Sequence, residues 1–390
     1  MLGRRVGVLA VVAALAGAGL TVVRVHAQQQ PADQVVHLLQ ELTDAVAPSG
    51  FEGPVRDILR REWQGLLTNI HTDGIGNLFG TLPGPASSPR VLIMAHMDEV
   101  GFLVRDIDPD GFIFFNNVGG YIDQSVLTQR MTILTPKGPV TGYTGFKSGH
   151  IVSAEERSRL VHLQDMFIDV GAKSRAEAEA MGIRPGLPIT YGTQFTVLNG
   201  THRYLAKAFD DRVGLAAATE ALRQLKSLPH PNTVEMAATV QEENGLRGAA
   251  VVQASTHPDI VINLEIGIAG DFPLLTSPKL SQERLGLGPG IFVFDSSMIP
   301  NNTFVDWITQ TAQAHQIPYQ FESVGGYGED GSELQRSGTG IPAINIGVPT
   351  RYGHSQSSVI DRSDFDNTVK LVVQMVQGLS AEQIKKITAF

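Results

Sequence analysis

The chain contains no cysteine, only two tryptophans, and no block of Lys or Arg along its 390 residues. The absence of cysteine excludes disulfides, thiolate nucleophiles and Cys-type metal sites, so any bound metal must rest on His and carboxylates. The net charge of −9 and the lack of a basic block argue against a nucleic-acid partner, since neutralising phosphates needs a basic surface. The scarcity of tryptophan leaves little aromatic surface on which sugars could stack.

The first thirty residues differ in character from the rest of the chain. Arg4 and Arg5 precede an apolar run over 6–23, and Val25-His26-Ala27 resembles an A-x-A cleavage site. This order predicts a signal peptide over 1–27, cut near Ala27, and a mature chain that is exported to a periplasm or secreted. An uncleaved N-terminal anchor is the alternative, because the run is close to the shortest that spans a bilayer. No later stretch is apolar enough, so we expect no membrane span in the mature chain.

Hydrophobic patterning predicts an α/β fold with a β-rich insert. Helical stripes are expected over 33–46 and 54–67, and the apolar run 91–95, which ends at His96, is typical of a buried central strand. From about residue 101 to 196, short β-type runs alternate with turns around one helix at 174–181. Strands near 233–240, 260–264 and 343–346 and helices over 212–225, 304–315 and 364–379 then follow. We therefore expect a catalytic domain in two parts, 31–103 and 199–390, interrupted by a small β-rich domain over 104–198.

Five segments place possible metal ligands at the ends of predicted strands or in the loops that follow them. They contain His96 with Asp98, Asp210 with Asp211, Glu242 with Glu243, Glu265, and His354. In α/β sheets such positions gather at the carboxyl edge, where ligands bind. Each segment alone also has a structural explanation, such as a solvated loop histidine or a charged surface turn. Together they supply two imidazoles and enough carboxylates for a two-metal hydrolase.

The residue types suggest a division of labour within these segments. Asp98 could orient the imidazole of His96, and Asp211 is a candidate helix N-cap, which leaves Asp210 free to bridge two cations. Glu242 and Glu243 are neighbours on an extended chain and point to opposite sides. One of them could therefore bind metal while the other faces the attacking water as general base.

Five motifs follow one another along the chain. These are His96-x-Asp98, Asp210-Asp211-Arg212-x-Gly214, Glu242-Glu243, an acidic strand end and Arg351-Tyr352-x-His354. In the order of these motifs the chain resembles the tetrahedral (glutamyl) aminopeptidase family. The similarity extends from about residue 33 to the C-terminus and includes 167–172 and 182–186 in the insert. The resemblance implies a mixed-sheet, phosphorylase/hydrolase-like co-catalytic metallopeptidase domain with an inserted β-barrel-like dimerisation domain. Members commonly assemble into hollow dodecamers that trim N-terminal residues from peptides, so this chain is expected to be a homo-oligomer, from a dimer up to a dodecamer, that acts on peptides.

The resemblance also implies a role for each candidate residue. Two divalent metal ions per subunit would be held by His96, Asp210 and Glu265 and by Asp210, Glu243 and His354. Glu242 would be the general base toward a metal-activated water, and Asp98 would orient His96. Zinc is the default for these ligands, which suit cobalt or manganese as well.

Two departures from the family pattern leave alternatives open. The family usually has Asp where this chain has Glu265, and Gly-Thr-Asp where it has Gly328-Glu329-Asp330. Glu at the first position often accompanies carboxypeptidase or N-acyl amino-acid deacylase activity, for which Arg212, Arg351 or Lys147 could hold the free carboxylate. Glu329 adds a negative charge near the expected substrate, where it could favour a basic side chain or a free amine.

Two further function classes are remote. A glycosidase needs two carboxyl groups that face each other across the bond, which the adjacent Glu242 and Glu243 do not naturally do. A catalytically inactive binding module should have lost ligands, whereas every ligand position here carries a competent residue.

Overall fold

The computed structural model describes residues 33–85, 89–275 and 281–389. The predicted signal peptide over 1–27, and the alternative anchor, lie outside these residues. Within the described part of the chain, no helix combines the length and the apolar character needed to cross a membrane.

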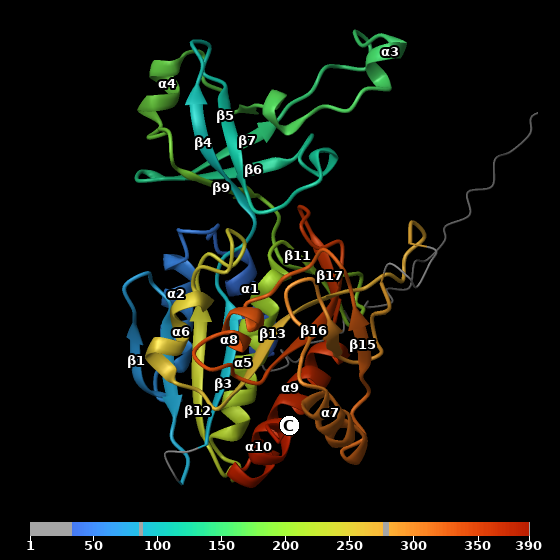
Figure 1. Cartoon of the computed structure of the whole chain (residues 1–390). Coiled ribbons are helices and arrows are strands. Elements are labelled where there is room, and N and C mark those ends of the chain that lie inside the picture. Colours follow the sequence, from blue (N-terminus) through green and yellow to red (C-terminus); the bar gives the residue numbers. More distant parts are fainter. Residues whose placement is uncertain (1–32, 86–88, 276–280, 390) are drawn as a thin grey trace, which may run out of the picture. The chain divides into compact units, whose positions relative to one another are not determined.

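A large mixed sheet carries most of the described strands (Figure 1). Its main path has the order β1-β2-β12-β3-β13-β16-β17-β11-β10, and β14 and β15 attach beside β16. The neighbours β12, β3, β13 and β16 are parallel, so their carboxyl ends meet at one edge of the sheet. The strands are β1 (Thr68–Thr72), β2 (Leu78–Leu82), β3 (Arg90–His96), β10 (Thr196–Val197), β11 (Arg203–Ala206), β12 (Thr233–Thr239), β13 (Ile260–Ile268), β14 (Gly290–Phe294), β15 (Gln320–Ser323), β16 (Ala343–Arg351) and β17 (Ser358–Asp361).

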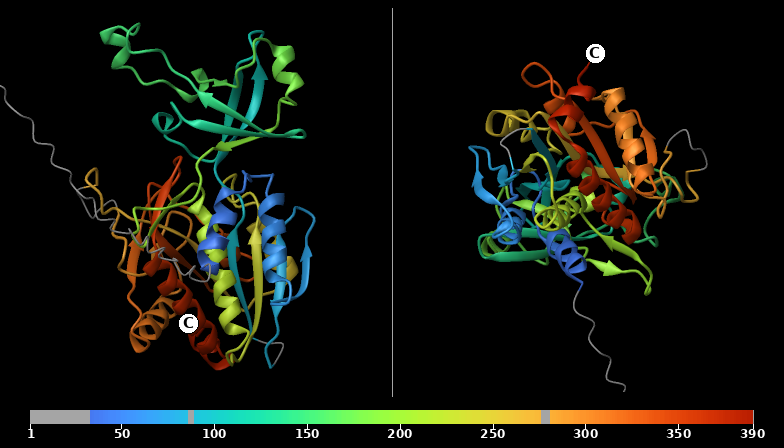
Figure 2. Two further views of the ribbon diagram at one scale, coloured as in Figure 1. Left: turned by 180° about the vertical axis from the view of Figure 1, so that it is seen from behind. Right: turned by 90° about the horizontal axis from the view of Figure 1, so that it is seen from below.

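Helices cover both faces of this sheet (Figure 2), which explains the continuous apolar runs of its central strands. In β3, Val91 and Ile93 face one core cluster, while Leu92 and Met94 face another. The first cluster is closed by α1 (Gln34–Asp44), α2 (Gly53–Trp63), α5 (Phe209–Leu225), α7 (Asn302–Ala314), α9 (Arg362–Gly378) and α10 (Ala381–Ile387), and the second by α6 (Ala249–Thr256) and α8 (Gly331–Gln335).

Six strands of the insert form a closed barrel in the order β4-β5-β8-β7-β6-β9. Its core is built from alternate residues such as Phe102, Ile113 and Ile133. β4 already begins at Gly101, and β10, which lies within the predicted insert, pairs with β11 of the large sheet. The bounds are β4 (Gly101–Ile107), β5 (Ile113–Val118), β6 (Arg130–Thr135), β7 (Gly138–Thr144), β8 (Ile168–Asp169) and β9 (Pro188–Tyr191), with α3 (Ala154–Arg157), α4 (Arg175–Ala180) and the short 3-10 turns Asp123–Ser125 and Leu163–Asp165 in the connections.

Two predicted strands end later than expected. β13 continues beyond Glu265 to Ile268, and β16 continues through Pro349 to Arg351. The two strands pair in parallel over this whole length, from Val261 opposite Ala343 to Ile268 opposite Thr350. Because the hydrogen bonds between the two strands keep both of them extended, Glu265 lies inside β13 and not at its end. This corrects the sequence-based interpretation.

Candidate metal centre

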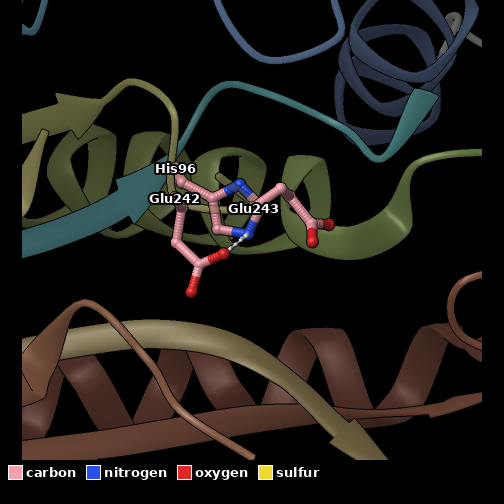
Figure 3. A group of neighbouring side chains, drawn as sticks. All are labelled: His96, Glu242 and Glu243. Atoms are coloured by element: carbon pink, nitrogen blue, oxygen red, sulfur yellow. Dashed lines mark ion pairs between the residues drawn. The ribbon is translucent and has the colours of Figure 1, made fainter. Parts of the chain in front are cut away.

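The five predicted ligand segments meet at the carboxyl edge of the parallel strands. His96 is the last residue of β3, the pair Glu242 and Glu243 follows β12, Glu265 lies in β13, and His354 follows β16. Figure 3 shows Glu242 directed at the imidazole of His96 while the carboxylate of Glu243 points elsewhere. The two glutamates lie in a turn after Gln241, which has a φ of 53°, and not on the extended segment that the sequence suggested. His96, Glu242 and Glu265 are buried, whereas Glu243 and His354 are only partly buried.

Asp210 lies between the two histidines. Its Oδ1 is 2.9 Å from Nε2 of His96, and its Oδ2 is 3.1 Å from Nε2 of His354. The segment that carries it precedes the regular part of α5, with non-helical backbone angles at Asp210 and Asp211. One carboxylate that presents a different oxygen to each imidazole has the arrangement needed to bridge two cations.

Two further carboxylates complete a group around each histidine. Oε2 of Glu265 is 3.5 Å from Nε2 of His96, and Oε1 of Glu243 is 3.5 Å from Nε2 of His354. His96 with Asp210 and Glu265, and His354 with Asp210 and Glu243, have ligand atoms within 4.8 Å of one another. A third such group joins His96 with Glu242 and Glu243. The structure thus brings together all five predicted metal ligands and the predicted base Glu242.

The longer side chain of Glu265, compared with Asp, is folded back onto its own backbone. Its Oε1 accepts a hydrogen bond of 2.8 Å from the N–H of Ile266, and Oε2 is left toward His96. The extra methylene is absorbed in this turn, so a single oxygen remains for a cation.

Backbone carbonyls orient both imidazoles from behind. Nδ1 of His96 is 3.1 Å from the carbonyl oxygen of Asp98, and Nδ1 of His354 is 2.9 Å from that of Gly120. With Nδ1 protonated and donating to these oxygens, Nε2 of each ring offers its lone pair to a metal. Gly120 follows β5 of the barrel, so a residue of the insert supports a ligand of the large sheet.

Asp98 connects the segments that carry the site. Its side chain lies 3.4 Å from Nδ1 of His96 and accepts hydrogen bonds from the backbone N–H groups of Glu242 (3.0 Å) and Glu243 (3.2 Å) and from the hydroxyl of Ser49 (2.5 Å). The ring-orienting role predicted for Asp98 is therefore joined by a second role, which is to hold the loop that carries the two glutamates.

Asp211 has the capping contact predicted for it. Its Oδ1 accepts from the N–H of Gly214 (3.0 Å), and its Oδ2 accepts from the N–H of His96 (3.2 Å). Both oxygens are thus occupied by backbone donors, whereas the oxygens of its neighbour Asp210 face the two histidines.

The charges of the site call for cations. Burial raises the pKa of Glu242 and Glu265 well above the usual range, and raises that of Glu243 to about 8. Burial lowers the pKa of His354, but the carboxylates of Glu243 and Asp210 outweigh it and raise the pKa to about 10. Oε1 of Glu243 is buried without a hydrogen-bond partner. Carboxylates and imidazole nitrogens crowded in this way fit two divalent cations, which would supply the missing positive charge.

A hollow of about 140 Å³ opens onto these residues. It is lined by Asp210, Glu242, Glu243, Glu265, Gly326, Tyr327, Gly328 and His354. None of these lining residues is a Lys or an Arg.

The cations considered for a carboxypeptidase are engaged elsewhere. Arg212 is fully buried and donates to backbone carbonyls and to Glu99. Lys147 is exposed on the insert and pairs with Glu156 at 2.9 Å. Arg351 donates through Nε and Nη2 to both oxygens of Asp271, at 2.7 and 2.5 Å.

Glu329 is also not where the sequence suggested. Only 1% of it is exposed, and it is absent from the lining of the hollow. Its Oε2 lies 3.5 Å from Nδ2 of Asn263 on β13. The expectation that its charge faces the substrate is therefore wrong, because the side chain turns into the protein.

Sequence reasoning missed the residues that support the site. Ser49, Gly120 and Tyr327 belong to loops with no ligand-like pattern, although the Gly119-Gly120 pair after an expected strand could have marked a close approach. A Cβ atom at Gly119 would lie 3.3 Å from Oε2 of Glu243.

A buried ion cluster beside the site was missed as well. Both oxygens of Glu99 are 2.8 Å from Nζ of Lys207, and its Oε1 is 3.5 Å from Nη2 of Arg212. All three side chains are at most 3% exposed.

Comparison with known proteins places this geometry in a family. The family model described as M42 glutamyl aminopeptidase matches residues 76–371. The lysyl aminopeptidase of Pyrococcus furiosus is 32% identical over 349 residues, which cover 88% of this chain and 96% of that protein.

Solved structures agree with this match. The TET aminopeptidase of a marine sediment archaeon (Thaumarchaeota archaeon SCGC AB-539-E09) superposes with a TM-score of 0.88 at 37% identity, covering 92% of this chain and all of that one. The TET1 peptidase of Pyrococcus horikoshii, described as able to assemble into a tetrahedron or a large octahedral shell, gives a TM-score of 0.80 at 30% identity, covering 88% of this chain and all of that one.

Proposed function

Because the chain belongs to the M42 glutamyl aminopeptidase family, and is therefore an aminopeptidase, we propose that it is an exported enzyme that uses two divalent cations and removes residues from the N-termini of peptides. The observation that carries the proposal is Asp210, whose two oxygens reach the Nε2 atoms of two histidines at 2.9 and 3.1 Å. Glu242 lines the same hollow and belongs to neither of the two groups that contain Asp210.

We assign His96, Asp210 and Glu265 to one cation and Asp210, Glu243 and His354 to the other. Zinc is the first choice, and cobalt or manganese suits the same ligands. When bound, two such ions polarise the scissile carbonyl and lower the pKa of the attacking water.

Glu242 is the general base of this proposal. Its backbone N–H is fixed by Asp98, and its carboxylate is 9% exposed at the hollow. It takes a proton from the attacking water and then delivers it to the nitrogen of the leaving amine, so one residue serves as base and then as acid. Asp98 is a positioning residue, because it holds His96 and the Glu242–Glu243 loop at once.

The electrostatics of the hollow favour a free amine over a free carboxylate. Its lining has four carboxylates and no Lys or Arg, and Arg212, Arg351 and Lys147 are held by other partners. A carboxypeptidase needs a cation near the substrate's terminal carboxylate. We therefore prefer aminopeptidase activity to carboxypeptidase activity, although Glu265 replaces the usual Asp.

Assembly and location complete the proposal. The structure of the TET1 relative motivates a homo-oligomer of this chain, from a dimer to a dodecamer, built through the inserted domain over 104–198. Ile122 and Ile151 of that domain are 70% and 74% exposed, so they are apolar positions that a second subunit could cover. The order of basic, apolar and small residues over 1–27 supports export, which N-terminal sequencing of the secreted or periplasmic protein would test.

The test uses a peptide panel read by mass spectrometry. Each peptide is prepared free, N-acetylated and C-amidated, and is offered to the zinc- or cobalt-loaded wild type, to Glu242→Gln and to the matched surface variant Glu156→Gln. We expect the wild type and Glu156→Gln to trim free and C-amidated peptides only, and Glu242→Gln to be slower by about 10²- to 10⁴-fold. Trimming from the C-terminus, or loss of the acetyl group alone, would instead identify the carboxypeptidase or deacylase.

A further inference from the structure

Tyr327 lies at the hollow between two glycines, Gly326 and Gly328. Its ring stacks on Phe292 of β14, with centroids 5.8 Å apart and planes inclined by 14°. Phe292 is itself fully buried, so the ring of Tyr327 rests on a fixed surface. The position of its hydroxyl is therefore set by packing and not by the mobility of a surface side chain.

The hydroxyl of Tyr327 is only weakly engaged. It donates to the carbonyl oxygen of Ile266 at 3.2 Å, whereas a typical O–H···O bond is about 2.7–2.8 Å long. Ile266 directly follows Glu265, and the charges of Glu265 and Asp210 bear on the phenol. A donor held by so long a bond can be transferred to a better acceptor at little cost.

The other lining side chains cannot provide such a donor. In the proposed reaction Asp210, Glu243 and Glu265 hold the cations and Glu242 accepts the water's proton. His354 has its Nδ1 directed at the carbonyl of Gly120 and its Nε2 at Asp210. The glycines have no side chain. Among the residues that line the hollow, the phenol is thus the one neutral side-chain donor.

Peptide hydrolysis needs a donor of this kind. When the water oxygen bonds to the scissile carbonyl carbon, the π electrons of the C=O bond move onto the carbonyl oxygen, and the water's proton passes to Glu242. The negative oxygen is stabilised by donors aimed at it. When the C–N bond breaks, the C=O bond re-forms and Glu242 returns the proton to the amine nitrogen.

We propose that Tyr327 is a catalytic residue whose hydroxyl leaves Ile266 and donates to the carbonyl oxygen of the scissile peptide as the tetrahedral intermediate forms. The inference rests on the proposed aminopeptidase reaction. It adds a donor from this chain to the stabilisation that the cations supply. The phenol remains protonated throughout, because burial and the charges of Glu265 and Asp210 raise its pKa well above the usual range.

The experiment compares the wild type with Tyr327→Phe and with Tyr143→Phe. Tyr143 lies on β7 of the barrel and is 49% exposed, so Tyr143→Phe makes the same chemical change away from the hollow. For the peptide that the wild type trims fastest, we would measure kcat, KM and bound cations by elemental analysis. Inhibition by an α-aminophosphonic acid, which mimics the tetrahedral intermediate, is compared with inhibition by the product amino acid.

We expect Tyr327→Phe to lower kcat by about 10²-fold, the low end for removal of one such donor, with KM changed less than about threefold. Phosphonate inhibition should weaken in parallel while product inhibition, cation content and unfolding midpoint stay unchanged. A kcat within about threefold of the wild type overturns the proposal, and so does a loss that follows lost cations or a raised KM. A wild type that trims no free peptide would instead refute the proposed function.

Discussion

Replacing Glu99 by Gln should destabilise the fold by removing the one negative side chain that two buried cations share. Lys207 and Arg212 are 3% and 0% exposed and both contact Glu99. Breaking a buried ion pair from one side typically costs about 3–5 kcal/mol, because it leaves a charge without compensation. Burial already lowers the pKa of Lys207, so in the variant this residue can release its proton and become neutral. We therefore expect a loss of unfolding free energy at the lower end of that range, about 3 kcal/mol.

Urea unfolding of the cation-free chain, followed by tryptophan fluorescence, would measure this loss. Trp63 is fully buried and its Nε1 donates to the hydroxyl of Thr219 on α5, the helix that also carries Arg212, so its emission reports on the folded core. With a slope of about 3 kcal/mol per M, the midpoint should fall by about 1 M.

The matched control is Glu41→Gln. Glu41 pairs with Arg61 at 2.6 Å on the surface, where such a pair contributes about 0–1 kcal/mol. If Glu99→Gln unfolds at the same urea concentration as Glu41→Gln, the buried cluster does not stabilise the fold and the reasoning is refuted.

The remaining predictions concern the cations and pH. His354→Ala should bind one divalent ion fewer per chain by elemental analysis, whereas His162→Ala, on the exposed insert, should match the wild type; equal contents would remove His354 from the ligand set. Burial raises the pKa of Asp364 from 3.8 to about 6, although the N–H groups of Gly286 and Gly288 donate to it. The folded state then keeps a proton that the unfolded state loses, so this residue's contribution to stability falls as pH rises from about 4 to 6. Between about pH 4 and 6 the urea midpoint of Asp364→Asn should therefore fall less with rising pH than that of the wild type. If the midpoints of the two proteins depend on pH in the same way, the prediction is wrong.

The ligand positions could be predicted because they depend on local rules. The apolar run 91–95 indicated a covered strand, and parallel strands bring the residues that follow them to one edge. His96 and Glu243 were therefore placed together without knowledge of the strand order. The prediction that Asp210 bridges two cations followed from giving its neighbour Asp211 to the helix. The hydrogen bonds of Asp211 confirm the part that concerns Asp211.

The features that the sequence did not predict depend on contacts between segments far apart in the chain. Nothing near Glu329 signals that its side chain turns toward Asn263, and the strand-end reading of Glu265 failed because β16 extends β13. The neighbours of Arg212 and Arg351 decide whether these cations can meet a substrate. Those neighbours, Glu99 and Asp271, are fixed by tertiary packing and not by spacing in the sequence.

The hydrogen bond from His354 to the carbonyl of Gly120 makes the position of the barrel a thermodynamic partner of metal binding. Whatever shifts the loop after β5 changes how well His354 is held, and therefore the affinity for its cation. Linkage is reciprocal, so a cation that fixes His354 stabilises that same placement of the loop by an equal free energy. Should subunits associate through the barrel, metal supply and assembly would regulate each other, and dilution or chelation would each report on both.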